Sequence, residues 1–147
     1  MNATAEKFGY PESLLARFEH WLVLLRPAQP TLGSLVLVCT DPVRRFGEIG
    51  SAASLELVQA TDRIERVLAA AFQNDRINYL MLMMVDPDVH FHVIPRYAEP
   101  RDFEGSSFTD SHWPGPPDLG DLLPIGEAQR ARLGAWLRAQ FEALTPE

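Results

Sequence analysis

The chain has almost no cysteine and no long apolar run. Its single cysteine, Cys39, excludes an intrachain disulfide and lies in the apolar run 35–39, where we expect a buried small hydrophobic side chain. No apolar stretch reaches the ~18 residues that a membrane span requires. The N-terminus has no basic stretch followed by an apolar run, as a signal peptide would. We therefore expect a soluble, cytoplasmic protein.

An excess of basic residues is also missing. The net charge is −7 and the isoelectric point about 5.0, which argues against binding to duplex nucleic acid. A local basic cluster can still bind the phosphate of a nucleotide. With 147 residues, 46% of them hydrophobic and 22% charged, and no internal repeat, the chain is expected to form one globular domain over residues 1–147.

The pattern of apolar residues and breakers predicts an α+β fold. Residues 51–72 contain no proline or glycine, and their apolar side chains recur at helical spacing. The nearly unbroken apolar run 77–85 is typical of a strand covered on both faces. The further expected elements are a short helix at 11–18, a hairpin of strands 20–25 and 34–40, a strand at 88–96, a long loop at 98–125 and a helix at about 127–144. Such helices would pack on one face of a mainly antiparallel sheet.

Two histidines lie two positions apart on the predicted strand 88–96. His90 and His92 should therefore share one face of the sheet at a separation of ~6.5–7 Å, and Asp88 extends the same row. Burying these polar groups unpaired would cost several kcal/mol each. Three interpretations stay open from the pattern alone: a solvated strand face, a histidine that attacks phosphorus, and a metal site of Asp88, His90 and His92.

The sequence around the histidines resembles a known signature. The run from His90 to Arg96, His-Phe-His-Val-Ile-Pro-Arg, resembles the second half of the histidine-triad (HIT) signature, in which three histidines alternate with apolar residues. A hairpin with Gly33 before its second strand, a long helix and two further strands follow the HIT order over roughly residues 18–100. The segment 113–116, Trp-Pro-Gly-Pro, is similar to one in divergent bacterial members.

This resemblance implies a fold and a chemistry. The fold would be a HIT-like domain with a five-stranded, mainly antiparallel sheet, a long helix on one face and a C-terminal helix. The protein would be a nucleotidyl hydrolase or transferase, similar to diadenosine polyphosphate hydrolases. It would act at the α-phosphate through a nucleotidyl-histidine intermediate, as a homodimer and without an obligatory metal or cofactor. The nucleophile would be His90, and the third triad position falls on His92.

The chain departs from the HIT pattern at the first triad position, which is Asp88. A carboxylate there would repel phosphate and favour a protonated His90, so Asp88→His is expected to raise nucleotide affinity or turnover. The polar loop that usually precedes the triad is replaced by the largely apolar segment 83–87. These departures support the alternative of a nucleotide-binding module with reduced or lost turnover. Substrate contacts are expected from Asp88, Asn78 and Arg96, with Arg44, Arg45 and Arg101 as further candidates for phosphate.

Overall fold

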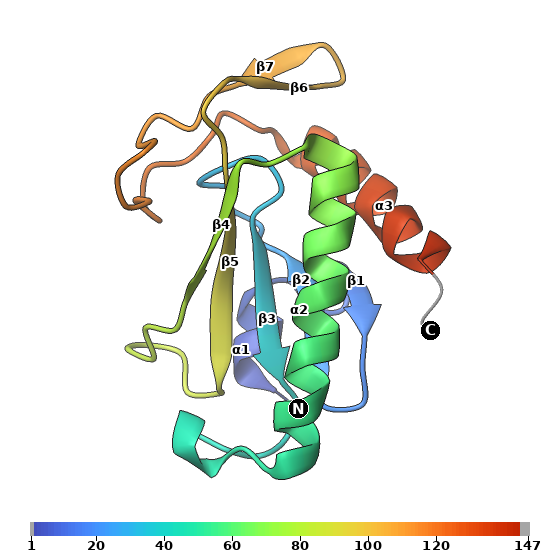
Figure 1. Cartoon of the computed structure of the whole chain (residues 1–147), viewed down its shortest axis with the longest axis vertical. Coiled ribbons are helices and arrows are strands. Elements are labelled where there is room, and N and C mark those ends of the chain that lie inside the picture. Colours follow the sequence, from blue (N-terminus) through green and yellow to red (C-terminus); the bar gives the residue numbers. More distant parts are fainter. Residues whose placement is uncertain (1, 145–147) are drawn as a thin grey trace.

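A five-stranded antiparallel sheet forms the centre of the protein (Figure 1). We describe it from a computed structural model, which describes residues 2–144. Across the sheet the strands run β1 (Leu14–Arg17), β2 (Trp21–Leu25), β3 (Leu35–Cys39), β5 (His90–Arg96) and β4 (Arg76–Leu80), and every neighbouring pair is antiparallel. The α+β fold expected from the sequence is confirmed.

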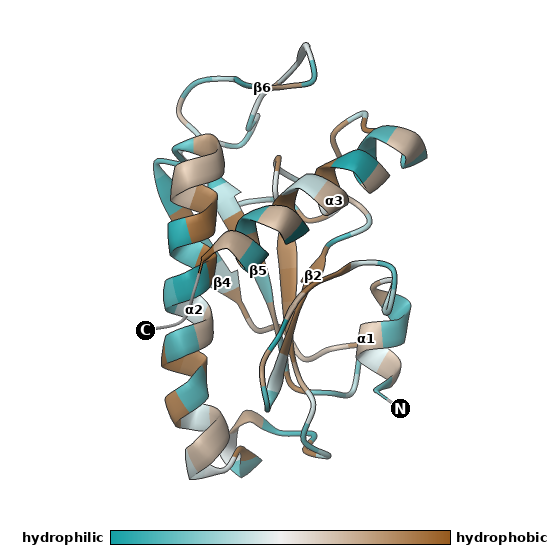
Figure 2. Cartoon of the chain, turned by 90° about the vertical axis from the view of Figure 1, so that its right-hand side faces the viewer, coloured by the Kyte–Doolittle hydropathy of each residue, from teal (hydrophilic) through white to brown (hydrophobic). Residues whose placement is uncertain are grey.

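Helices cover both faces of this sheet. The long helix α2 (Ser51–Phe72) lies along one face, as predicted, and α3 (Glu127–Ala143) packs against β1 and α2. The short helix α1 (Ala3–Lys7) lies on the opposite side, so the sheet is sandwiched between α1 and α2 (Figure 2). Gly33 adopts a φ of +86° before β3, and a Cβ atom there would lie 3.0 Å from the ring of Phe72. This close approach of turn and helix requires glycine.

Each face of the sheet has its own apolar layer. The larger layer joins the sheet to α2 and α3 and includes Trp21, Leu37, Ile64 and Leu137. The smaller layer joins the sheet to α1 and consists of Ala5, Phe8, Leu22, Leu24, Val36 and Val38. Because residues of β2 and β3 alternate between the two layers, both strands are fully buried.

Three expected elements differ from the structure. The predicted helix 11–18 contains strand β1, because Leu15 is buried and the strand pairs with β2. The predicted strand 77–85 ends at Leu80, and β4 is a partly exposed edge strand rather than one covered on both faces. The loop 98–125 contains a small hairpin, β6 (Arg101–Phe103) and β7 (Ser106–Phe108). A 3-10 turn, Phe46–Glu48, precedes α2.

Cys39 is completely buried at the end of β3, as expected. Within residues 2–144, no helix is both long enough and apolar enough to cross a membrane.

Candidate active site

His90 and His92 lie at the start of β5, on the sheet face that looks away from α2. Their neighbours across the sheet are Val38 and Val36, which belong to the apolar layer under α1. The exposed fractions of His90 and His92 are 2% and 6%, and their ring centroids are 5.2 Å apart at an interplanar angle of 83°. The predicted shared face of the two histidines is confirmed.

The orientation of His90 is fixed by the main chain. Its Nδ1 lies 2.7 Å from the carbonyl oxygen of Asp88, which can only accept a hydrogen bond. Nδ1 must therefore carry the proton, and Nε2 keeps the free lone pair in the neutral ring. A single tautomer with an available nitrogen is the form that a histidine nucleophile requires.

His92 is held in a different electrostatic state. Burial is the largest cause of a pKa lowered to about 4, and the nearby His90, Arg26 and Lys7 add to the effect. Only Asp86 acts in the opposite direction. The ring is thus neutral at pH 7, and its buried Nδ1 has no hydrogen-bond partner among residues 2–144.

The N-terminal segment covers both histidines. The ring of Phe8 lies 6.2 Å from that of His90 and 5.7 Å from that of His92. The segment is attached through Asp88, whose carboxylate accepts a hydrogen bond from the backbone N–H of Thr4 at 3.1 Å. The backbone N–H of Asp88 in turn donates to the Thr4 hydroxyl at 3.1 Å. Asp88 therefore holds α1 against the sheet through Thr4.

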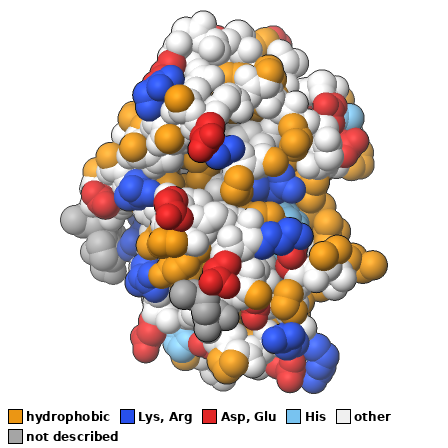
Figure 3. All heavy atoms as spheres, turned by 180° about the vertical axis from the view of Figure 1, so that it is seen from behind, with side chains coloured by type: hydrophobic (Ala, Val, Ile, Leu, Met, Phe, Trp, Pro, Cys, Tyr) orange, Lys and Arg blue, Asp and Glu red, His pale blue; other side chains and the backbone are white. Residues whose placement is uncertain are grey.

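A small cavity of about 260 Å³ opens beside the histidines. It is lined by Lys7, Phe8, Arg26, Leu82, Met83, Met84, Val85, Asp86, His90, His92 and Leu119. One part of the cavity is therefore basic and rich in imidazole, and the other part is apolar. Seen from behind, histidine and basic side chains lie close together beside an apolar projection (Figure 3). A larger hollow of about 570 Å³ between β1 and α3 contains no histidine, so its size alone does not make it the candidate site.

Two basic residues at this cavity were not singled out from the sequence. Arg26 directly follows β2, where Gln29 organises the turn by donating to the Arg26 and Ser34 carbonyls at 2.6 and 2.8 Å. The buried Nε of Arg26 has no hydrogen-bond partner among residues 2–144. Lys7 ends α1, and its Nζ lies 2.9 Å from the Asp86 carboxylate. Neither residue lies near the histidines in sequence, so only the fold brings these charges to the cavity.

Comparison with known proteins decides the family. A family model for the HIT domain matches residues 9–99. The chain belongs to the HIT domain family. No functionally curated protein matches it. The HIT assignment confirms the resemblance seen at residues 90–96.

Solved HIT proteins share this fold. A histidine triad protein from Marinobacter aquaeolei is 23% identical with a TM-score of 0.72, and 99% of each chain is covered. The histidine triad protein blr8122 from Bradyrhizobium japonicum is 18% identical with a TM-score of 0.71, and 96% of each chain is covered. Diadenosine triphosphate hydrolase from Plasmodium falciparum is 8% identical with a TM-score of 0.65, covering 90% of this chain and 78% of that one. At these identities, the similarity shows a common fold.

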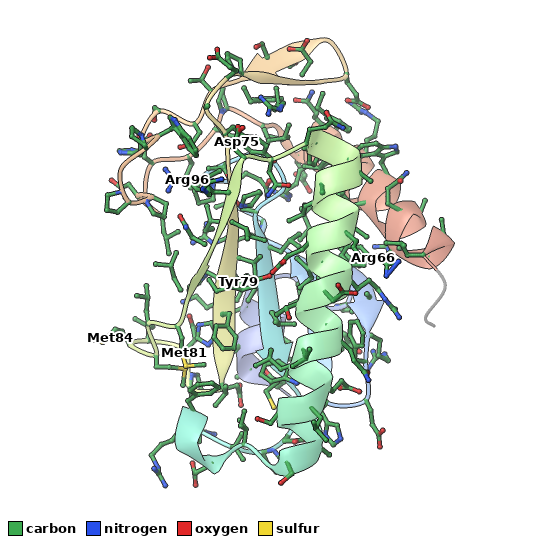
Figure 4. All side chains as sticks on the ribbon, in the orientation of Figure 1. Arg66, Asp75, Tyr79, Met81, Met84 and Arg96 are labelled. Carbon is green, nitrogen blue, oxygen red and sulfur yellow. The ribbon has the colours of Figure 1, made fainter. Side chains whose placement is uncertain are left out.

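Arg96 and Asn78 are not brought to the cavity of this HIT protein. Arg96 lies six residues beyond His90 on β5, a distance of roughly 20 Å along a strand. It is buried and donates to Asp110 at 2.7 Å, to Asn78 at 2.8 Å and to the Gly115 carbonyl at 2.9 Å. Figure 4 shows Arg96 at the opposite end of the sheet from Met84. Arg96 anchors the loop 98–125, which in turn supplies Leu119 to the cavity.

The other candidates for phosphate contacts also lie outside the cavity. Arg44 and Asp88 line a separate hollow of about 440 Å³ on the far side of α1. Arg45 pairs with Glu48 in the 3-10 turn, and Arg101 donates to the carbonyl of Phe72. The carboxylate of Asp88, from which a substrate contact is expected, is bound to α1 and lies outside this cavity.

A metal site at Asp88, His90 and His92 finds no support in the geometry. Within residues 2–144, no group of three or more His, Cys, Asp or Glu side chains is arranged to hold a metal ion. The Asp88 carboxylate is directed at the backbone of Thr4, and His90 Nδ1 at a carbonyl.

Proposed function

We propose that this HIT protein catalyses hydrolysis or nucleotidyl transfer at the α-phosphate of a nucleotide, with His90 as the nucleophile. The observation that carries the proposal is the 2.7 Å contact between His90 Nδ1 and the Asp88 carbonyl. In the neutral ring this contact leaves Nε2 without a proton, in a residue that lines the cavity. As the ring becomes a cation on bonding to phosphorus, the same carbonyl accepts a stronger hydrogen bond and stabilises the charge.

The reaction has two steps. In the first, the Nε2 lone pair of His90 forms a bond to the α-phosphorus while the bond from phosphorus to the leaving oxygen breaks. The leaving group takes the electron pair of that bond and a proton from solvent. In the second, water or another acceptor hydroxyl attacks phosphorus, loses its proton, and the P–N bond breaks. His90 returns to its neutral form, and the nucleotide is released as a monophosphate or transferred.

His92 is proposed to hold the phosphate in place. Because its pKa is lowered to about 4, it is neutral at pH 7 and can donate its one N–H to a phosphate oxygen. Its ring lies almost perpendicular to that of His90, at a centroid distance of 5.2 Å. A phosphate bound at His90 would therefore lie within reach of both rings.

Kinetics with diadenosine polyphosphates, nucleoside phosphoramidates and sugar nucleotides test this function. On whichever substrate is cleaved, His90→Ala should lower kcat by several orders of magnitude, because a covalent nucleophile is lost. His112→Ala is the matched control, since the side chain of His112 is 38% exposed and pairs with Asp121 outside the cavity. Unchanged turnover in His90→Ala would refute the assignment.

A second function, a nucleotide-binding module without turnover, is favoured by one observation. The cavity of about 260 Å³ is smaller than the roughly 300–1,000 Å³ that is usual for ligand pockets. Such a site would hold a phosphate and part of a nucleoside without room for a leaving group. Calorimetry with AMP and GMP separates the two functions: tight binding with no product after long incubation supports the module.

We also propose that the protein forms a homodimer. Strand β4 is an edge of the sheet, and Leu55 and Val58 on α2 are 72% and 68% exposed. Unpaired strand edges and large exposed apolar side chains are typical of surfaces that associate. Sedimentation equilibrium should give twice the chain mass of 16.5 kDa, and a monomer at micromolar concentration would contradict the proposal.

A further inference from the structure

The N-terminal segment 2–8 lies outside the part of the chain that matches the HIT family, residues 9–99. It nevertheless supplies two residues of the candidate active site, Lys7 and Phe8. Lys7 is the only lysine in the chain, in which the other twelve basic residues are arginines. The segment thus places a positive charge, that of Lys7, and the aromatic ring of Phe8 beside the histidines.

Two polar attachments hold this segment, and they differ in environment. The first joins Thr4 to Asp88 by reciprocal hydrogen bonds, and both residues are buried. A buried hydrogen bond from an amide to a carboxylate is strong, and losing one partner leaves the other unsatisfied. Asn2 adds a hydrogen bond of 2.8 Å from its side chain to the Cys39 carbonyl. The start of α1 is therefore firmly docked on the sheet.

The second attachment is weaker. The side chain of Lys7 is 51% exposed where it pairs with Asp86, whose own side chain is 14% exposed, so solvent reaches the pair from the lysine end. Exposed ion pairs contribute little net stability, because water and salt screen them. Lys7 can therefore exchange Asp86 for another anion while Thr4 stays bound to Asp88. Both Lys7 and Asp86 line the cavity, so that anion would be inside it.

The charges around the cavity indicate which anion this would be. Among the lining residues within 2–144, Lys7 and Arg26 are the cations and Asp86 is the one carboxylate. Two cations against one carboxylate leave the lining, apart from its histidines, with a net charge of +1 whether or not Lys7 is paired with Asp86. Such a lining attracts a phosphate, and Lys7 is the cation that can turn toward it, because solvent already reaches its side chain.

We propose that residues 2–8 are a working part of the active site, in which Asp88 docks the segment and the docked Lys7 leaves Asp86 to bind a phosphate oxygen of the substrate. The identity of this anion rests on the proposed function. Asp88 is then a positioning residue. Its carboxylate, at the first triad position, acts on the protein's own N-terminal segment, while its carbonyl orients His90.

Protection of Lys7 from acetylation tests the proposal without requiring turnover. The full chain is treated with an amine-acetylating reagent, and the modification rate of the Lys7 peptide is followed by mass spectrometry. Millimolar AMP should slow acetylation at least several-fold, whereas adenosine, which has no phosphate, should not. Equal rates with and without AMP would overturn the proposal, even if His90 proves to be the nucleophile. Protection by AMP in a protein without turnover would support this inference and contradict the proposed reaction.

Variants then separate the roles of Lys7 and Asp88. Lys7→Met should weaken AMP binding by on the order of tenfold, the loss of one charge-assisted contact. Arg66→Met is the matched control, because Arg66 is a similarly exposed residue in an ion pair on α2. Asp88→Ala should abolish protection of Lys7 by AMP, while Asp88→Asn, which can still accept from Thr4, should restore part of it. Thr4→Pro keeps Asp88 but removes both the N–H that donates to its carboxylate and the hydroxyl that accepts from its backbone N–H, and should act like Asp88→Ala. Full protection in both Asp88→Ala and Thr4→Pro would refute the docking role.

Discussion

Acid should destabilise this protein through His92. In the folded chain its pKa is lowered from 6.5 to about 4, first by burial and then by the neighbouring positive groups. In the unfolded chain the same ring takes up a proton near pH 6.5. Between these values the unfolded state binds more protons, so the free energy of unfolding must fall as the pH falls. Above about pH 6.5 the full stability is present.

The size of the effect follows from the two pKa values. At about 1.4 kcal/mol per pH unit, the interval from 6.5 to about 4 corresponds to about 3 kcal/mol when fully expressed. This is a large part of the free energy of unfolding of a typical globular domain, roughly 5–15 kcal/mol. The loss should be steepest between about pH 6 and about pH 4.5.

Urea denaturation of the wild type and of His92→Asn, over the range from about pH 7.5 to about pH 4.5, measures this contribution. Asparagine does not titrate, and every other acidic or basic group is common to both proteins. His20, whose pKa is raised by its hydrogen bond to Asp41, stabilises in the opposite sense but cancels in the comparison. The free energy of unfolding of the wild type, relative to that of the variant, should fall as the pH falls. A difference that stays constant over this range would show that His92 is not a buried neutral ring.

Further predictions concern stability. Asp88→His leaves the buried N–H of Thr4 without its acceptor and should cost about 1–3 kcal/mol in chemical denaturation. Unchanged stability would contradict this role of the carboxylate, and a gain in nucleotide affinity or turnover would agree with the expectation from the sequence. Arg96→Met leaves Asp110 as an uncompensated buried charge and should cost about 3–5 kcal/mol. The double variant Arg96→Met/Asp110→Leu should recover part of that loss, and no recovery would contradict an ion-pair role. Gly33→Ala should lower the melting temperature, because a side chain at φ +86° is strained by more than about 1 kcal/mol.

The fold was predictable where a single element carried a clear pattern. Helix α2 begins at Ser51 and ends at Phe72, as the uninterrupted helical spacing indicates. The alternation in 88–96 also placed both histidines on one face. Strand β1 was missed because four residues, Leu14–Arg17, are too few to show a period, and pairing with β2 decides their conformation. Strand β4 is shorter than its apolar run because Leu80 is the last residue that pairs with β5, and residues 82–85 line the cavity instead.

The candidate site was predictable only in its local part. His90 and His92 follow from one strand, but Lys7 reaches them through a helix of five residues, too short to be stable alone. That helix depends on Asp88, 84 residues away from Thr4 in the chain, so no local signal marks it. Arg96 was placed at the site by proximity in sequence, although six residues of strand separate it from His90.

The most direct test of the central claim is to trap the covalent intermediate. The protein is mixed with a cleavable nucleotide, quenched under basic conditions that preserve a phosphorus–nitrogen bond, and digested for mass spectrometry. The account predicts one nucleotide monophosphate per chain on the peptide that contains His90, lost on acid treatment and absent from His90→Ala. Turnover that proceeds without this adduct, or an adduct on another residue, would contradict His90 as the nucleophile.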